Sequence, residues 1–173
     1  WRRYLARIRT RKRHNILFYY PGMKKSIQLN ENSETIAVLL IEDDPGDADL
    51  IAIVFQRQRE TIQLKIVHDG EEAIAYLRQK TDEVLPDLIL LDLNLPGKSG
   101  REVLKAIKSD EQLKQIPVVI LTASKAPEEV LTSYKLGANA YLTKPAGLAG
   151  FTTIIESIDN FWLTLVHLPP NLR

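Results

Sequence analysis

Short apolar runs alternate with amphipathic segments along most of the chain. Five such runs predict β-strands at residues 37–41, 64–67, 87–91, 118–121 and 140–142. Between and after them, apolar residues recur at the three- and four-residue spacing of helices, which predicts helices at residues 47–59, 71–79, 100–108, 127–136 and 148–165. Pro127 in a first helical turn and Gly137 just past a helix end agree with these boundaries.

The strict alternation of strands and helices indicates an α/β fold with a parallel sheet covered by helices on both faces. Right-handed crossovers leave few topologies. Among these we expect the flavodoxin-like, doubly wound, five-stranded order 2-1-3-4-5 with five helices. In such folds the functional site lies at the carboxyl ends of the strands.

Polar residues follow four of the predicted strands directly. They are Glu42, Asp43 and Asp44; Asp92 and Asn94; Thr122 and Ser124; and Thr143 and Lys144. Clustered carboxylates repel one another, and removing them from water is unfavourable unless a cation compensates. Mg²⁺ prefers oxygen ligands and uses one or two carboxylates, so we expect Mg²⁺ as the cofactor.

The same set of side chains suits a phosphoryl group. A metal and Lys144 could neutralise its oxygens, Thr122 offers a hydroxyl donor, and a carboxylate could attack phosphorus to form an aspartyl-phosphate. Positioning and electrostatics supply most of the catalysis in such transfers.

Four motifs in this order resemble those of bacterial response-regulator receiver domains. They are Glu42-Asp43, Asp92-Leu93-Asn94-Leu95-Pro96-Gly97, Leu121-Thr122-Ala123 and Tyr141-Leu142-Thr143-Lys144-Pro145. The resemblance extends over roughly residues 35–161. It implies a signalling phosphoacceptor that catalyses only its own phosphotransfer and autodephosphorylation, and so no enzyme in the usual sense.

The resemblance also implies a role for each site residue. Asp92 is the phosphoacceptor and, with Asp43 and the backbone carbonyl of Asn94, a Mg²⁺ ligand, whereas Glu42 acts through water. Lys144 holds the phosphoryl oxygens, and a cis bond to Pro145 is implied after it. Thr122 and Tyr141 form the switch pair.

Other polar residues near the strand ends have a simpler interpretation. We interpret Asp44 and Asp47 as turn residues or helix caps. His14, His68 and His167 are scattered, and we expect all three to be structural, although His68 lies near a strand end.

Charge is unevenly distributed along the chain. Residues 1–22 contain seven basic and no acidic side chains, which leaves 16 basic and 22 acidic side chains in residues 23–173. We assign residues 1–34 to an N-terminal extension and 35–160 to the receiver domain. Residues 1–22 are either a basic arm for nucleic acid or lipid, or non-native or upstream-translated sequence before Met23. We favour the second interpretation.

The C-terminal segment 161–173 contains more apolar residues than one helix face can bury. Exposed together they would form a large apolar patch, so we predict a dimerisation element and a symmetric homodimer. The expected interface residues are Phe161, Trp162 and Leu165. No segment is long enough for an output domain, and the net negative charge of residues 23–173 opposes DNA binding. We therefore expect signalling through protein contacts.

The short length and this C-terminal segment are similar to single-domain regulators paired with cyanobacterial phytochromes. That similarity implies a phytochrome-type sensor histidine kinase as phosphodonor in a two-component phosphorelay. No apolar run is long enough to span a membrane, and we expect no membrane association and a cytoplasmic location.

Two other functions stay open from the sequence. A degenerate receiver would keep the fold as a phosphorylation-independent interaction module, although the complete set of acids, threonine and lysine opposes it. A hydrolase of the haloacid-dehalogenase type would need a second acid two residues after the nucleophile, where this chain has Asn94.

Overall fold

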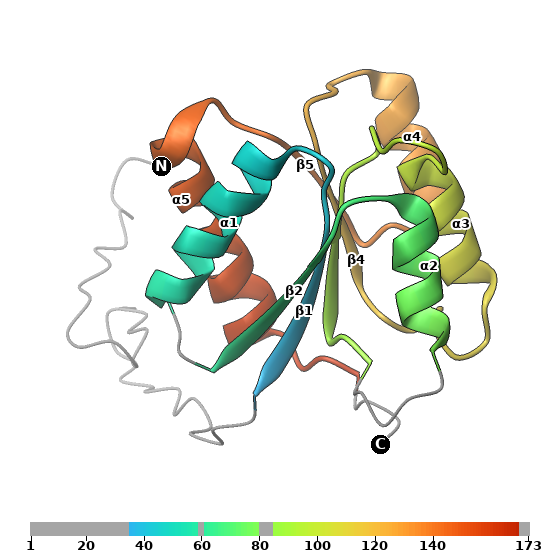
Figure 1. Ribbon diagram of the computed structural model, residues 1–173, viewed down its shortest axis with the longest axis horizontal. Helices are drawn as coiled ribbons and strands as arrows, with labels where there is room; N and C mark the ends of the chain where they lie inside the picture. The colour runs from blue at the N-terminus through green and yellow to red at the C-terminus, as the bar shows by residue number, and fades with distance from the viewer. Residues whose placement is uncertain (1–34, 59–60, 80–84, 170–173) are drawn as a thin grey trace, which may run out of the picture. The chain divides into compact units, whose positions relative to one another are not determined.

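Five strands alternate with five helices in the computed structural model, which describes residues 35–58, 61–79 and 85–169 (Figure 1). The strands are β1 (Ile36–Ile41), β2 (Ile62–Val67), β3 (Leu88–Leu91), β4 (Val118–Thr122) and β5 (Ala140–Thr143). The helices are α1 (Pro45–Gln58), α2 (Gly70–Arg78), α3 (Gly100–Ser109), α4 (Pro127–Lys135) and α5 (Gly147–Asn160). The predicted N-terminal extension, residues 1–34, lies outside the described residues.

All five strands are parallel and form one sheet in the order β2-β1-β3-β4-β5. The predicted fold class and strand order are therefore confirmed. The central strands β1 and β3 pair up to their carboxyl ends, where Ile41 lies beside Leu91. One residue further, the amide of Asp92 donates to the carbonyl oxygen of Ile41 at 3.0 Å.

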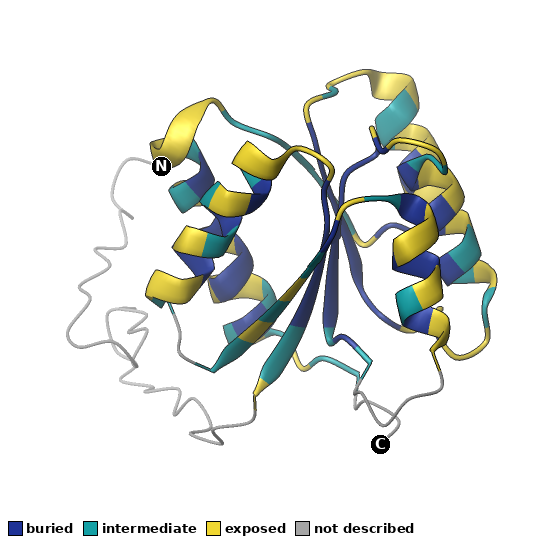
Figure 2. Cartoon of the chain, in the orientation of Figure 1, coloured by how far each residue is buried: buried dark blue, intermediate teal, exposed yellow. Residues whose placement is uncertain are grey.

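The two faces of the sheet are covered by different helices (Figure 1). Because successive side chains of a strand point to opposite faces, Leu39 and Ile41 pack with α2 and α3, whereas Val38 and Leu40 pack with α1 and α5. All four of these side chains are buried, as the dark strands in Figure 2 show. Burial on both faces explains why the strands are apolar throughout rather than alternating.

Local sequence fixes where several helices begin and end. Asp69 caps α2 by accepting from the amide of Glu72 at 2.7 Å, and Ser99 forms a capping box with Glu102 at the start of α3. Gly137, two residues after the end of α4, has a φ of +96°, a conformation that glycine adopts without steric strain.

The last helix differs from the prediction of one continuous helix over residues 148–165. The α-helical part ends at Asn160, and Phe161–Leu165 forms a π-helical turn, labelled η1. In this turn the amide of Val166 donates to the carbonyl oxygen of Phe161 at 3.0 Å, and Leu163 is buried. The wider turn brings Leu163 into the apolar cluster on the α1 and α5 side of the sheet.

Among the described residues, no helix combines the length and the apolar character that crossing a membrane would require.

Candidate functional site

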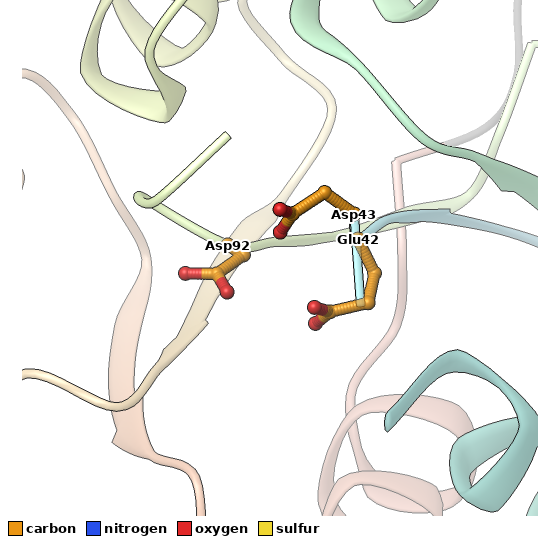
Figure 3. Close-up of side chains that lie close together, drawn as sticks. All are labelled: Glu42, Asp43 and Asp92. Atoms are coloured by element: carbon orange, nitrogen blue, oxygen red, sulfur yellow. The ribbon is translucent and has the colours of Figure 1, made fainter. Parts of the chain in front are cut away.

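Three carboxylates meet where the two central strands end. Glu42 and Asp43 follow β1, and Asp92 follows β3, its direct neighbour in the sheet. One oxygen from each of the three lies within 4.8 Å of the others, and Figure 3 shows the three carboxylates gathered around one space. Glu42 and Asp92 are buried, whereas Asp43 is exposed to solvent.

Lys144 brings a positive charge to these acids from the end of β5. Its amide donates to the carbonyl oxygen of Thr122 at 2.8 Å, which extends the pairing of β4 with β5 by one residue. Its ammonium nitrogen lies 2.6 Å from Asp92 Oδ2 and 2.7 Å from the carboxylate of Glu42. Lys144 therefore joins both buried acids in one ion-pair cluster.

Burial and charge have opposing effects on the pKa of each of the two residues Glu42 and Lys144. Removal from water raises the pKa of Glu42 to about 7, although Lys144 opposes this rise by hydrogen bonding and by its charge. For Lys144, burial alone would lower the pKa. The hydrogen bonds to Asp92 and Glu42 outweigh burial and raise the pKa above its ordinary value. The lysine is therefore fully protonated at neutral pH.

The donor set at this site fits a hard divalent cation. All three convergent groups are carboxylates, the ligand type that Mg²⁺ and Mn²⁺ accept, and the exposure of Asp43 leaves the cluster open to solvent. Neutralisation by one lysine leaves the acids with excess negative charge, which a divalent ion would compensate.

Asn94 and Thr122 lie beside Asp92. The Asn94 amide donates to Asp92 Oδ1 at 3.0 Å, so the two oxygens of Asp92 have different partners. The side-chain amide of Asn94 is 3.5 Å from Oγ1 of Thr122, a fully buried residue at the end of β4. Asn94 thus links the Asp92 carboxylate to the Thr122 hydroxyl group.

Tyr141 lies on β5 beside Ile120 of β4 and is half-buried. Its hydroxyl donates to the carbonyl oxygen of Ser124 at 3.1 Å, in the connection between β4 and α4. Burial raises the pKa of Tyr141, so the phenol is neutral. The two residues predicted as a switch pair therefore lie on neighbouring strands, with Tyr141 bonded to the main chain two residues after Thr122.

The model of the response regulator receiver domain family matches residues 38–156, more than half of the chain. The chain is a response-regulator receiver. This family consists of signalling phosphoacceptors rather than classical enzymes, as expected from the sequence, and a receiver implies a histidine kinase as partner.

Similar proteins and solved structures indicate which receivers this chain resembles. Response regulator Rcp1 of Synechocystis sp. is 42% identical over 143 residues, covering 81% of this chain and 97% of the relative. A crystal structure of Mn²⁺-bound Rcp1 has a TM-score of 0.73 at 43% identity and covers 78% of this chain and 99% of that one. The phosphorylated cyanobacterial phytochrome response regulator RcpA has a TM-score of 0.74 at 44% identity, covering 78% of this chain and 98% of that one.

The sequence did not reveal one member of the receiver's charged cluster. Asp47, interpreted as a turn or cap residue, lies with Oδ2 3.0 Å from the ammonium of Lys144. Asp44 is the residue that caps α1, because its Oδ1 accepts from the Asp47 amide at 2.8 Å. The position of Asp47 in the first turn of a helix is equally typical of an acid that only stabilises that helix, so the sequence held no signal for this ion pair.

His68 and Pro145 complete the surroundings of the receiver site. The His68 ring nitrogen Nδ1 lies 3.0 Å from the main-chain oxygen of Glu42, and His68 is exposed. The expected cis bond between Lys144 and Pro145 is wrong: among the described residues no peptide bond is cis. The trans form is the commoner one for bonds that precede proline.

The C-terminal residues predicted to form a dimer interface lie in η1. Phe161 and Leu165 are exposed, Trp162 is half-buried, and the Phe161 and Trp162 rings meet edge to face with centroids 5.3 Å apart. Residues 170–173 of this segment lie outside the described residues.

Proposed function

We propose that this receiver accepts a phosphoryl group on Asp92 from a phosphohistidine of a phytochrome-type sensor histidine kinase. An oxygen of the Asp92 carboxylate attacks phosphorus, a P–O bond forms, and the P–N bond to the donor imidazole breaks. The released imidazole nitrogen keeps the bonding electron pair and takes up a proton. The observation that carries this proposal is the placement of a buried carboxylate beside Lys144 and two further acids.

Each neighbour of Asp92 has a defined part in this proposal. The ammonium of Lys144, now 2.6 Å from Asp92 Oδ2, holds a phosphoryl oxygen after transfer. The Asn94 amide, 3.0 Å from Oδ1, fixes the orientation of the carboxylate. Thr122 supplies a hydroxyl donor from a fully buried position. Preorganised donors of this kind stabilise the developing charge without reorganisation.

The cofactor in this proposal is Mg²⁺. Asp43, Asp92 and the backbone carbonyl of Asn94 would hold it directly, and Glu42 would act through water. The ion would supply neutralisation of the phosphoryl oxygens in a site that already contains an excess of carboxylates. The convergence of the three acids and the Mn²⁺-bound crystal structure of Rcp1 support this assignment.

The output in this proposal is a change in the face formed by α4, β5 and α5. Phosphorylation adds roughly −1.5 to −2 charge at Asp92. Thr122 turns to donate to a phosphoryl oxygen, and Tyr141 leaves the Ser124 carbonyl oxygen for the space that Thr122 vacates. Such a local charge change can be read out through a packing element with two arrangements.

The proposed partners are the kinase and a second copy of this chain. The phytochrome pathway is supported by the similarity to RcpA, which is named as a cyanobacterial phytochrome response regulator, at 44% identity. The proposed dimer forms in the cytoplasm through Phe161, Trp162 and Leu165, without contact to DNA or membrane. Its support is the exposure of two of these three apolar side chains.

A phosphotransfer assay with a labelled phytochrome-type kinase and Mg²⁺ tests the acceptor role. The wild type and a Glu111→Gln control, altered at a surface acid at the opposite end of the sheet, should take up label, and Asp92→Asn should take up none. Labelling of Asp92→Asn would refute the assignment. Absence of labelling in the wild type, with no response to beryllofluoride and Mg²⁺, would favour a phosphorylation-independent interaction module.

Light scattering at micromolar concentration tests the dimer. The wild type should have twice the monomer mass, and Phe161→Ser with Leu165→Ser should be monomeric. Ile53→Ser is the matched control, because Ile53 is an exposed apolar residue on α1, outside the proposed interface. A monomeric wild type would contradict the proposed interface.

A further inference from the structure

Asp47 has a place in the site that the receiver motifs do not assign. It lies in the first turn of α1, where the side chain of Asp44 holds its amide at 2.8 Å. This cap fixes the start of the helix so that Asp47 faces the site rather than solvent alone. Its Oδ2 is 3.0 Å from the ammonium nitrogen of Lys144, and its side chain is 29% exposed.

Lys144 is thereby shared among three carboxylates. Its nitrogen lies 2.6 Å from Asp92 Oδ2, 2.7 Å from the Glu42 carboxylate and 3.0 Å from Asp47 Oδ2. The side chains of Glu42 and Asp92 are almost fully buried, so they have little water to replace the lysine. Asp47 is the partner on the solvent side of the lysine.

A phosphoryl group on Asp92 changes the balance among these three carboxylates. Conversion of the Asp92 carboxylate to an acyl phosphate removes its charge and places a dianionic group next to Lys144. The ammonium must then bond a phosphoryl oxygen while Asp47 still attracts it. Both the attraction of Asp47 for Lys144 and its repulsion of the incoming anion oppose this new bond.

We propose that Asp47 is a positioning residue that competes with the phosphoryl group for Lys144 and so weakens the hold of the site on the phosphorylated state. The inference rests on the proposed acceptor role of Asp92. Its consequence is a receiver whose active form is less stable than its buried acids and lysine would otherwise make it.

The size of the effect follows from Coulomb's law. A unit charge at about 5 Å that water screens almost as strongly as in bulk contributes on the order of 1 kcal/mol, equivalent to about a fivefold change in an anion's dissociation constant. Removing the charge of Asp47 should therefore strengthen binding of a phosphoryl analogue about fivefold.

Beryllofluoride, which mimics a phosphoryl group on a carboxylate, provides the test. Its dissociation constant is measured by ¹⁹F NMR with excess Mg²⁺ for the full chain and three variants. Asp47→Asn should bind about fivefold more tightly than the wild type. Asp47→Glu, which keeps the charge, should bind like the wild type. Asp49→Asn, at an exposed acid on the same helix, is the matched control and should stay within about twofold of the wild type.

Unfolding measurements separate this role from a merely structural one. An acid in the first turn also stabilises α1 through the helix dipole, so Asp47→Asn should be slightly less stable than the wild type while binding the analogue more tightly. Equal or weaker binding by Asp47→Asn would overturn this inference alone. A wild type that binds no beryllofluoride would overturn the acceptor role of Asp92 and this inference with it.

Discussion

Gly100 lies against the main chain of Asp92. A Cβ atom at Gly100 would be 2.0 Å from the carbonyl oxygen of Asp92 and 2.6 Å from the Cα of Leu93. The Gly100 amide also donates to the Leu93 carbonyl oxygen at 3.1 Å. Helix α3 thus begins in direct contact with the turn that carries Asp92, the proposed acceptor, and only glycine permits this approach.

Gly100→Ala should therefore lower the free energy of unfolding by about 3 kcal/mol, because main-chain atoms on both sides must move. Urea denaturation measures the change. Gly46→Ala in α1 is the control: its new Cβ would meet only the Asp44 Oδ1 atom at 3.1 Å, and alanine favours the helix by roughly 1 kcal/mol. Equal stability losses in the two variants would contradict the tight contact at Gly100.

Removal of the lysine from the ion-pair cluster should destabilise the metal-free protein strongly. Lys144→Met leaves Glu42 and Asp92 buried without their cation, a change expected to lower the free energy of unfolding by about 3–5 kcal/mol. Excess Mg²⁺ should restore part of the loss by supplying another positive charge. Urea denaturation in EDTA and in Mg²⁺ measures both effects, with the exposed Lys125→Met as control.

The pKa of about 7 for buried Glu42 gives the metal-free protein a defined pH dependence. Between about pH 4.5 and 7 the unfolded chain has released this proton while the folded chain keeps it, so the free energy of unfolding falls as pH rises. The total fall is on the order of 1–3 kcal/mol. Urea denaturation in EDTA measures the free energy of unfolding against pH for the wild type and for Glu42→Gln. The difference between the two profiles isolates the contribution of Glu42. Parallel pH profiles for the two proteins would contradict the raised pKa.

Lys108 stabilises the opposite end of the sheet. Its ammonium donates to the carbonyl oxygens of Ile116 and Lys114 at 2.7 and 3.1 Å and to the Asn139 side chain at 3.2 Å. Lys108→Met leaves these acceptors without their donor and should lower the free energy of unfolding by about 1–3 kcal/mol.

Thermal or urea unfolding measures that loss against Lys105→Met, an exposed lysine on the same helix that should change stability by less than about 0.5 kcal/mol. Phosphotransfer to the Lys108→Met protein should be unchanged, because Lys108 lies at the end of the sheet away from Asp92. A Lys108→Met protein as stable as the Lys105→Met control would show that water satisfies the same acceptors.

The apolar pattern of the sequence predicted strand positions most reliably for the strands whose side chains are buried on both faces of the sheet. Strands β1, β3 and β4 contain uninterrupted apolar residues because helices cover both faces, and their carboxyl ends identify the positions of Glu42, Asp92 and Thr122. The edge strand β2 begins two residues earlier than predicted, at Ile62. Its half-exposed alternation gives a weaker signal than a buried run.

Contacts that depend on side-chain reach could not be predicted in the same way. The ion pair of Asp47 with Lys144 joins residues far apart in sequence, and a first-turn acid has the same appearance whether it stabilises only its helix or also a distant lysine. The three acceptors of Lys108 are of the same kind, since two are main-chain carbonyl groups with no sequence signature. The π-helical turn was missed because the spacing of apolar residues is nearly the same whether the last turn is α-helical or contains one extra residue.

The hydrogen bond from the Asp92 amide to the Ile41 carbonyl oxygen makes the proposed acceptor residue part of the ladder between the two central strands. The lysine that neutralises it arrives 52 residues later in the chain. During synthesis the acids therefore emerge first and stay without their cation until β5 has followed. A growing chain thus contains the proposed nucleophile well before it contains the lysine proposed to hold the phosphoryl group, so competence to receive a signal would arise only after β5 has been made.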